Sequence, residues 1–134
     1  MRLLLLWTIA MPTSTRAAVL IVHGSGDSLV NGDYAPQNPA VVPAGFRRTC
    51  EAQLWDPEAM WRKLSDGRRH WYLSPNDSYI YFNVGDGNWW IDEPGGGGVY
   101  IVPGIGDENV PPPTGWQALP GAQLPVPVVE ARSL

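Results

Sequence analysis

The chain has 134 residues, of which 44% are hydrophobic and only 16% charged, and its formal net charge is −4. Its 15 glycines and 14 prolines exclude a helical bundle or a coiled coil, because both residue types penalise helix interiors. Seven tryptophans, five tyrosines and two phenylalanines argue against simple disorder, since they can build a core. The acidic balance disfavours nucleic-acid binding. We therefore expect one small, turn-rich, mainly β domain.

Residues 1–17 have the composition of a short signal peptide. Arg2 precedes an apolar run at residues 3–10, and Thr15, Arg16 and Ala17 form a tolerable cleavage site. The run is far shorter than the ~20 residues needed to cross a membrane, so no membrane span is expected. The segment is predicted to be either a signal peptide, which would imply secretion, or an unprocessed N-terminal tail.

Residues 18–27 read AVLIVHGSGD, an apolar strand that runs into the turn His23-Gly24-Ser25-Gly26. This segment resembles the strand and oxyanion turn that open α/β-hydrolases. The chain has no G-x-S-x-G nucleophile motif, and no helices are predicted to alternate with strands. A hydrolase-like fragment is therefore a distant third hypothesis, and a glycine turn that ends a strand is the simpler interpretation.

The next segment alternates turn and loop signals. Asn31-Gly32 predicts a tight turn between two extended pieces, and the proline-rich residues 35–45 predict a loop. Asp56-Pro57-Glu58 is a typical helix start, because an acidic cap precedes a proline in the first turn. Two interpretations follow: a short helix near residues 57–64, or one helical turn that gives way to a strand at residues 60–64. The second is slightly favoured.

The clearest pattern lies in residues 70–102, where short aromatic strands alternate with turns. Strands are predicted at residues 70–73, 79–83, 88–92 and 99–102. Strand centres recur about every ten residues, which is typical of an antiparallel meander. We predict a mainly β fold, a small antiparallel meander or a partly open barrel or sandwich, with at most one short helix. The single module spans residues 18–129, with a loop or insertion near residues 35–59 and a tail at residues 130–134.

The alternation within this region predicts a core. Ile80 and Phe82 share one face of their strand, and Trp89 and Ile91 share one face of the next. The short connection at residues 84–87 makes the two strands antiparallel neighbours, so these four side chains form the central core cluster. The opposite face is expected to meet solvent, a lid or a ligand, and it carries Tyr79, Tyr81, Trp90 and Asp92.

Six landmarks occur in a fixed order between residues 19 and 129. They are residues 24–26, Asn31-Gly32-Asp33-Tyr34, residues 79–83, Trp89-Trp90-Ile91, Gly98-Val99-Tyr100 and Pro112-Pro113-Thr114-Gly115-Trp116. In this order they resemble a small tryptophan-rich β module of uncharacterised eukaryotic proteins, often from algae and protists. The resemblance implies a β module that often accompanies other domains, and it supplies no catalytic residues. Residues 35–59 are longer than the pattern, which indicates an insertion or an error in the gene model.

No set of residues predicts catalysis, a metal site or a cofactor. Asp92 and Glu93 are adjacent in a strand, so their side chains point to opposite faces and do not form a pair. Cys50 is the single cysteine, which excludes an intrachain disulfide and predicts an inert thiol. His23 and His70 are the only histidines and lack zinc-site spacing. A local basic group predicts a solvated turn in preference to a phosphate site: Arg62, Lys63, Arg68, Arg69 and His70.

The leading hypothesis is a non-enzymatic β module that binds a protein or a glycan. Its motivation is an aromatic sheet without a catalytic set, because tryptophan and tyrosine give large contact areas at low entropic cost. The alternative is a secreted carbohydrate-binding module, while most of the tryptophans are expected to be core. The candidate binding residues are Trp61, Trp71, Tyr79, Tyr81, Trp90, Asp92 and Trp116.

Overall fold

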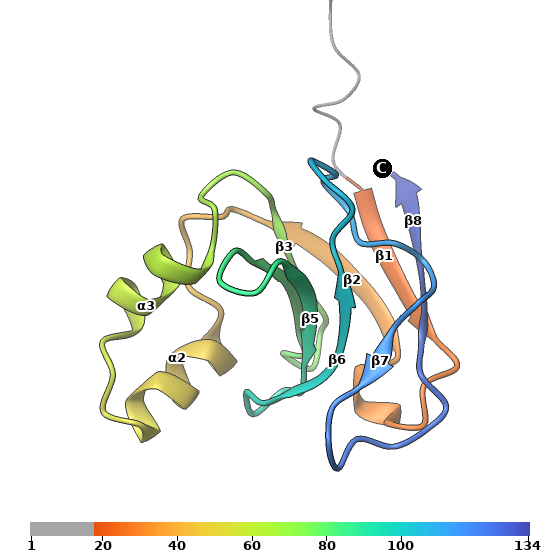
Figure 1. The fold of residues 1–134 in the computed structure, drawn as a ribbon, viewed down its shortest axis with the longest axis horizontal. Coiled ribbons are helices and arrows are strands. Elements are labelled where there is room, and N and C mark those ends of the chain that lie inside the picture. The colour runs from red at the N-terminus through yellow and green to blue at the C-terminus, as the bar shows by residue number, and fades with distance from the viewer. Residues whose placement is uncertain (1–17) are drawn as a thin grey trace, which may run out of the picture.

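The computed structural model describes residues 18–134, in which eight antiparallel strands form one sheet that curls into a half-barrel (Figure 1). This confirms the mainly β, partly open barrel. The order across the sheet is β7-β6-β5-β4-β3-β2-β1-β8. The predicted signal peptide lies outside the described residues. The strands are β1 (Ala18–His23), β2 (Gly32–Gln37), β3 (Trp71–Leu73), β4 (Tyr79–Asn83), β5 (Asn88–Asp92), β6 (Gly98–Pro103), β7 (Gln117–Ala118) and β8 (Val128–Ser133).

The central pair, β4 and β5, has the predicted register. Ile80 pairs with Ile91, and Phe82 pairs with Trp89. Period-two alternation therefore places all four side chains on the concave face of the sheet. Three of them are fully buried, and Phe82 is partly buried against them. The inner cluster consists of Leu20, Val22, Val30, Tyr34, Tyr72, Ile80, Trp89, Ile91, Val99, Tyr100, Val102, Trp116 and Val129.

Two α-helices are present where at most one was predicted: α2 (Ala44–Ala52) and α3 (Pro57–Leu64), besides the 3-10 turn η1 (Ser28–Val30). The strand expected at residues 60–64 is wrong. Asp56 caps α3 by accepting hydrogen bonds from the backbone of Glu58 and Ala59, which stabilises the helix start. No helix within residues 18–134 has the length and apolar character that a membrane span requires.

The predicted loop or insertion near residues 35–59 is mostly ordered secondary structure, because it holds the end of β2, all of α2 and the start of α3. The sequence did not predict α2, because the prolines clustered just before it indicate a loop. Phe46 and Cys50, four residues apart, form its buried face. Gly45 lets the helix approach the sheet, because a Cβ there would meet the Tyr79 ring and the backbone of Gly96.

Both helices cover the convex face of the sheet, on the side away from β1 and β8 (Figure 1). We call residues 38–70, which contain α2 and α3, the helical cover. The outer cluster beneath it consists of Val42, Phe46, Cys50, Trp61, Trp71, Tyr79, Tyr81 and the partly buried Met60, Leu64, Leu73 and Trp90. The sheet thus has an apolar layer on each face, not one core face and one open face.

Two further predictions change at the ends of the sheet. The tail predicted at residues 130–134 is mostly strand, because β8 pairs with β1 from Val128 through Ser133. The predicted Asn31-Gly32 turn between two extended pieces is wrong, because residues 28–30 form η1 and Gly32 begins β2, which pairs with β1 across residues 24–31. Trp116, which follows the proline segment and precedes β7, packs into the inner cluster.

Candidate functional site

The predicted aromatic binding surface is not open to solvent. Six of its seven residues are buried, and the partly buried Trp90 packs against the outer cluster. Trp116 belongs to the inner cluster, so it lies on the other face of the sheet from the rest. The structure therefore brings together five buried residues under the helical cover, and no flat ring is presented outward: Trp61, Trp71, Tyr79, Tyr81 and Asp92.

The rings of the outer cluster pack against one another. The Trp61 ring lies edge-on to Phe46 with centroids 5.1 Å apart, and its centroid is 5.5 Å from that of Tyr81. The indole N–H groups of Trp61 and Trp71 donate to the backbone carbonyls of Pro39 and Asn38. Such edge-to-face contacts with satisfied donors are typical of a structural core.

Asp92 differs from the other polar groups of this layer, because it is a buried carboxylate without a cationic partner. Its Oδ2 accepts hydrogen bonds from the Tyr79 hydroxyl at 2.9 Å and from the Gly97 amide at 3.3 Å. Its Oδ1 is buried without any hydrogen-bond partner. Burial outweighs the two hydrogen bonds and raises the pKa of Asp92 to about 6.

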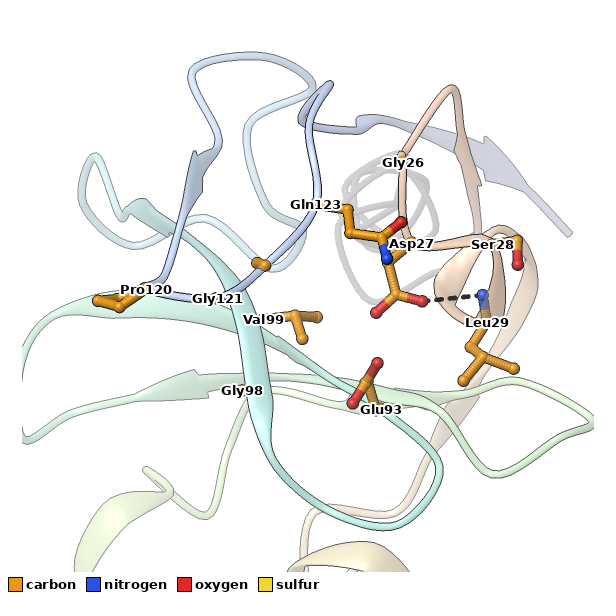
Figure 2. Close-up of a pocket in the computed structure, with 11 residues that line it drawn as sticks. Gly26, Asp27, Ser28, Leu29, Glu93, Gly98, Val99, Pro120, Gly121 and Gln123 are labelled. Carbon is orange, nitrogen blue, oxygen red and sulfur yellow. Dashed lines mark hydrogen bonds between the residues drawn. The ribbon is translucent and has the colours of Figure 1, made fainter.

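A pocket of about 490 Å³ lies elsewhere, between three loops at one end of the sheet (Figure 2). The loop after β1, the turn between β5 and β6, and the loop after β7 supply its walls. Small residues and backbone dominate the lining, so the pocket carries no aromatic ring. It is lined by Gly26, Asp27, Ser28, Leu29, Glu93, Gly98, Val99, Pro120, Gly121, Ala122 and Gln123.

Two carboxyl groups face each other in this pocket. Figure 2 shows the side chains of Asp27 and Glu93 pointing toward one another, with Gln123 beside Asp27. The hydrogen bond that Glu93 shares with Asp27, together with burial and the nearby charge, raises the pKa of Glu93 to about 7. In the described part of the chain, no lysine, arginine or histidine lines the pocket. It is therefore an acidic site without an internal counter-ion.

Local interactions hold Asp27 in place. Asp27 caps η1 by accepting a hydrogen bond from the Leu29 amide at 3.0 Å, and its own amide donates to the Ser25 hydroxyl. Gly26 permits the loops to meet, because a Cβ there would lie 2.2 Å from the Leu124 carbonyl oxygen. The carboxylate of Asp27 is thus fixed at the pocket by its own turn.

Sequence reasoning missed this pair. Asp27 ends the glycine turn, and Glu93 follows β5 just before Pro94 and a run of glycines. The side chains of Asp92 and Glu93 point to opposite faces, as expected for adjacent residues at the end of a strand. Asp92 lies in the outer layer, and Glu93 lines the pocket. Nothing in the sequence, however, indicates that the turn after β1 meets the turn after β5, because that depends on the curl of the sheet.

The hydrolase-like turn has no nucleophile and base in contact. The Ser25 hydroxyl bonds to the Tyr100 hydroxyl at 2.9 Å and to the Asp27 carbonyl at 3.1 Å. The His23 ring bonds instead to Glu130 at 2.7 Å. We expect no covalent labelling of Ser25 by a serine-directed probe.

The basic group also differs from a solvated turn. Arg69 is buried: its guanidinium lies 3.9 Å from the centre of the Phe82 ring and bonds to Asp66 and to the carbonyls of Gly106 and Glu108. Arg68 bonds to Asp107 at 2.9 Å. Both guanidinium groups are therefore occupied and form no phosphate site.

Among residues 18–134, no group of three or more His, Cys, Asp or Glu side chains could hold a metal ion. Cys50 is buried in α2, and burial raises the pKa of its thiol. The fold and the pocket together define a small β half-barrel with a helical cover and an acidic site built from loops. No protein-family model, no curated protein and no solved structure matches this chain.

Proposed function

We propose that the chain is a non-enzymatic binding module that holds a positively charged group, the lysine or arginine side chain of a protein partner, between Asp27 and Glu93. The observation that carries this proposal is the pair of facing carboxyl groups in a pocket whose described lining holds no basic residue. The neighbouring Asp27 carboxyl helps to raise the pKa of Glu93, which shows that a second negative charge in this pocket is unfavourable. A bound cation would offset that charge.

The lining suits the end of a long basic side chain. Gly98 and Gly121 leave room beside the carboxyl groups, and Gln123 adds a side chain that can both donate and accept. Hydrogen bonds from an ammonium or guanidinium to carboxylates are charge-assisted and contribute about 1.5–3 kcal/mol each. The partner would need only one exposed basic residue to enter the pocket.

The carbohydrate-binding alternative is supported less well. Sugar recognition by stacking needs an accessible ring, and in the described residues Trp55 is the most exposed tryptophan at 50%. Trp55 does not line the acidic pocket. A protein partner that offers a cation is therefore the better match.

The test is calorimetric titration with Nα-acetyl-lysine methylamide at pH 8, which lies above the raised pKa of Glu93. We expect saturable binding that weakens as the pH falls below about 7, because protonation of Glu93 then competes with the ammonium group. Glu93→Gln removes one charge and is expected to weaken binding at pH 8 by about tenfold or more.

The matched control is Asp33→Asn, which removes one negative charge from an exposed strand position outside the pocket. It should leave the affinity within about twofold of the wild type, since long-range charge effects are screened at ordinary salt. The Nε-acetylated form of the same ligand has no charge and should not bind. Equal binding of the two ligands, or no binding of either, would refute the cation site.

A further inference from the structure

The helical cover is the connection between β2 and β3, two strands that pair directly with each other. β2 and β3 are antiparallel neighbours, with Ala35 opposite Leu73 and Gln37 opposite Trp71. The cover leaves the sheet after β2 and returns at β3. Its displacement from the convex face would therefore leave every ladder of the sheet intact.

The cover is internally braced. Arg47 of α2 and Glu58 of α3 form an ion pair, and the rings of Phe46 and Trp61 pack edge-to-face at 5.1 Å. The Trp55 amide, just after α2, donates to the Cys50 carbonyl at 2.8 Å. The two helices can accordingly move as one body.

Polar attachments of the cover lie at its two ends, where Trp71 donates to the Asn38 carbonyl and Arg69 donates to the carbonyls of Gly106 and Glu108, and at its edges. Arg48 donates to the Pro94 carbonyl at 2.6 Å, and the Val84 amide donates to the Leu64 carbonyl at 2.8 Å. Between these points the contact is aromatic, with Tyr81 against Phe46 and Trp61. Among the described residues, the Arg68–Asp107 ion pair ties the end of the cover to the loop after β6, and no ion pair joins the cover to a strand of the convex face.

Asp92 ends β5 on the convex face, close to the Arg48–Pro94 attachment, and its Oδ1 is buried without a partner. The groups that face it are the hydroxyls of Tyr79 and Tyr81 on β4 and the amide of Gly97, while Cys50 of α2 packs in the same cluster. The neighbouring cation of α2, Arg48, bonds to the Pro94 carbonyl instead. A buried carboxylate without a cationic partner is costly, and the cost disappears when the carboxyl is protonated or hydrated.

We propose that ionisation of Asp92 loosens the helical cover from the sheet, so that the cover acts as a proton-controlled lid over the aromatic convex face. Closure keeps Asp92 protonated and dry, and opening lets water reach the carboxylate. The face that opening exposes carries Trp71, Tyr79 and Tyr81, which sequence analysis selected as binding residues. The lid uses a different carboxyl group from the pocket, although the charge of Asp92 contributes to the raised pKa of the adjacent Glu93.

The raised pKa of Asp92 in the closed state determines how closure depends on pH. Protonation favours closure below the ordinary aspartate pKa, and the advantage is lost as the pH rises through about 6. A shift of this size changes the closed-to-open ratio by up to about 100-fold across the whole titration. Most of the change should therefore occur between about pH 4 and pH 6, and little should follow above pH 6.

Amide hydrogen exchange of the full chain tests the lid, with rates corrected for the intrinsic pH dependence of exchange. Between pH 4.5 and 7.5 we expect opening of α2 and α3 to increase roughly 10- to 30-fold, while β1 and β8 change little. Parallel loss of protection in β1 and β8 would show global unfolding and overturn the lid. Unchanged helix protection would overturn it as well.

Two variants separate Asp92 from its neighbour. Asp92→Asn cannot ionise, so protection of the helices should become independent of pH. Glu93→Gln, which changes the pocket, should retain the wild-type pH dependence of the cover. If Asp92→Asn keeps that dependence, or if Glu93→Gln abolishes it, Asp92 is not the switch. The wild-type comparison of helices with strands decides the matter even if Asp92→Asn fails to fold.

Discussion

Replacing Tyr81 by alanine is expected to cost about 3–5 kcal/mol of unfolding free energy, as much as Phe82→Ala or more. Tyr81 is 5% exposed, and its ring contacts Phe46, Trp61 and Tyr79. Phe82 lies on the concave face, where it is only partly buried. Urea denaturation of the two variants provides the comparison.

The sequence alone predicted that the Tyr81 face meets solvent, a lid or a ligand. The helical cover makes the convex face a second core, which is why a large loss is expected at Tyr81. A much smaller loss for Tyr81→Ala than for Phe82→Ala would show that the cover contributes little to stability in solution.

Arg69→Met is expected to cost about 3 kcal/mol, because it removes the cation from a buried network. The Arg69 guanidinium bonds to Asp66 at 2.5 Å and to the carbonyls of Gly106 and Glu108 at 2.8 and 2.6 Å. Methionine fills a similar volume but satisfies none of these acceptors. Thermal unfolding near neutral pH should show a clear drop in midpoint.

Arg68→Met is the matched control, since it removes the same charge at the adjacent position. The Arg68 side chain is half exposed and pairs with the exposed Asp107, so its loss should cost less than about 1 kcal/mol. Equal destabilisation by the two variants would mean that general charge, not the buried network, explains the effect.

Asp66 adds a pH dependence to this network. Burial works to raise its pKa, but hydrogen bonds from Arg69 and Arg68 outweigh burial and hold the pKa below its usual value. The stability from this group is therefore present above the ordinary aspartate pKa and is lost as the pH falls through the lowered value. Arg69→Met should reduce that acid-side loss without abolishing it, because the backbone amides of residues 68 and 69 still donate to Asp66.

The best-predicted parts of the fold are those with short-range determinants. The register of β4 and β5 follows from period-two alternation and a short turn, so Ile80 opposite Ile91 could be derived from sequence. The Asp56 cap likewise specifies the start of α3. These features depend on neighbours a few residues apart, which a single sequence displays.

The features that sequence did not predict depend on distant contacts. Helix α2 is stabilised by its fit to the sheet through Gly45 and Phe46, while the prolines before it indicate a loop. Arg69 belongs to a basic group in sequence and is buried only because residues 106–108 fold over it. The Asp27–Glu93 pair exists because the curled sheet brings two turns together.

The most direct test of the proposed function is an NMR titration of the ¹⁵N-labelled chain with Nα-acetyl-lysine methylamide at pH 8. The cation site predicts that the largest amide shifts fall at residues 26–29, 97–99 and 121–123, around the two carboxyl groups. The Nε-acetylated ligand should leave these amides unchanged. Shifts confined to the indoles of Trp55 and Trp90, or no difference between the two ligands, would contradict the proposal.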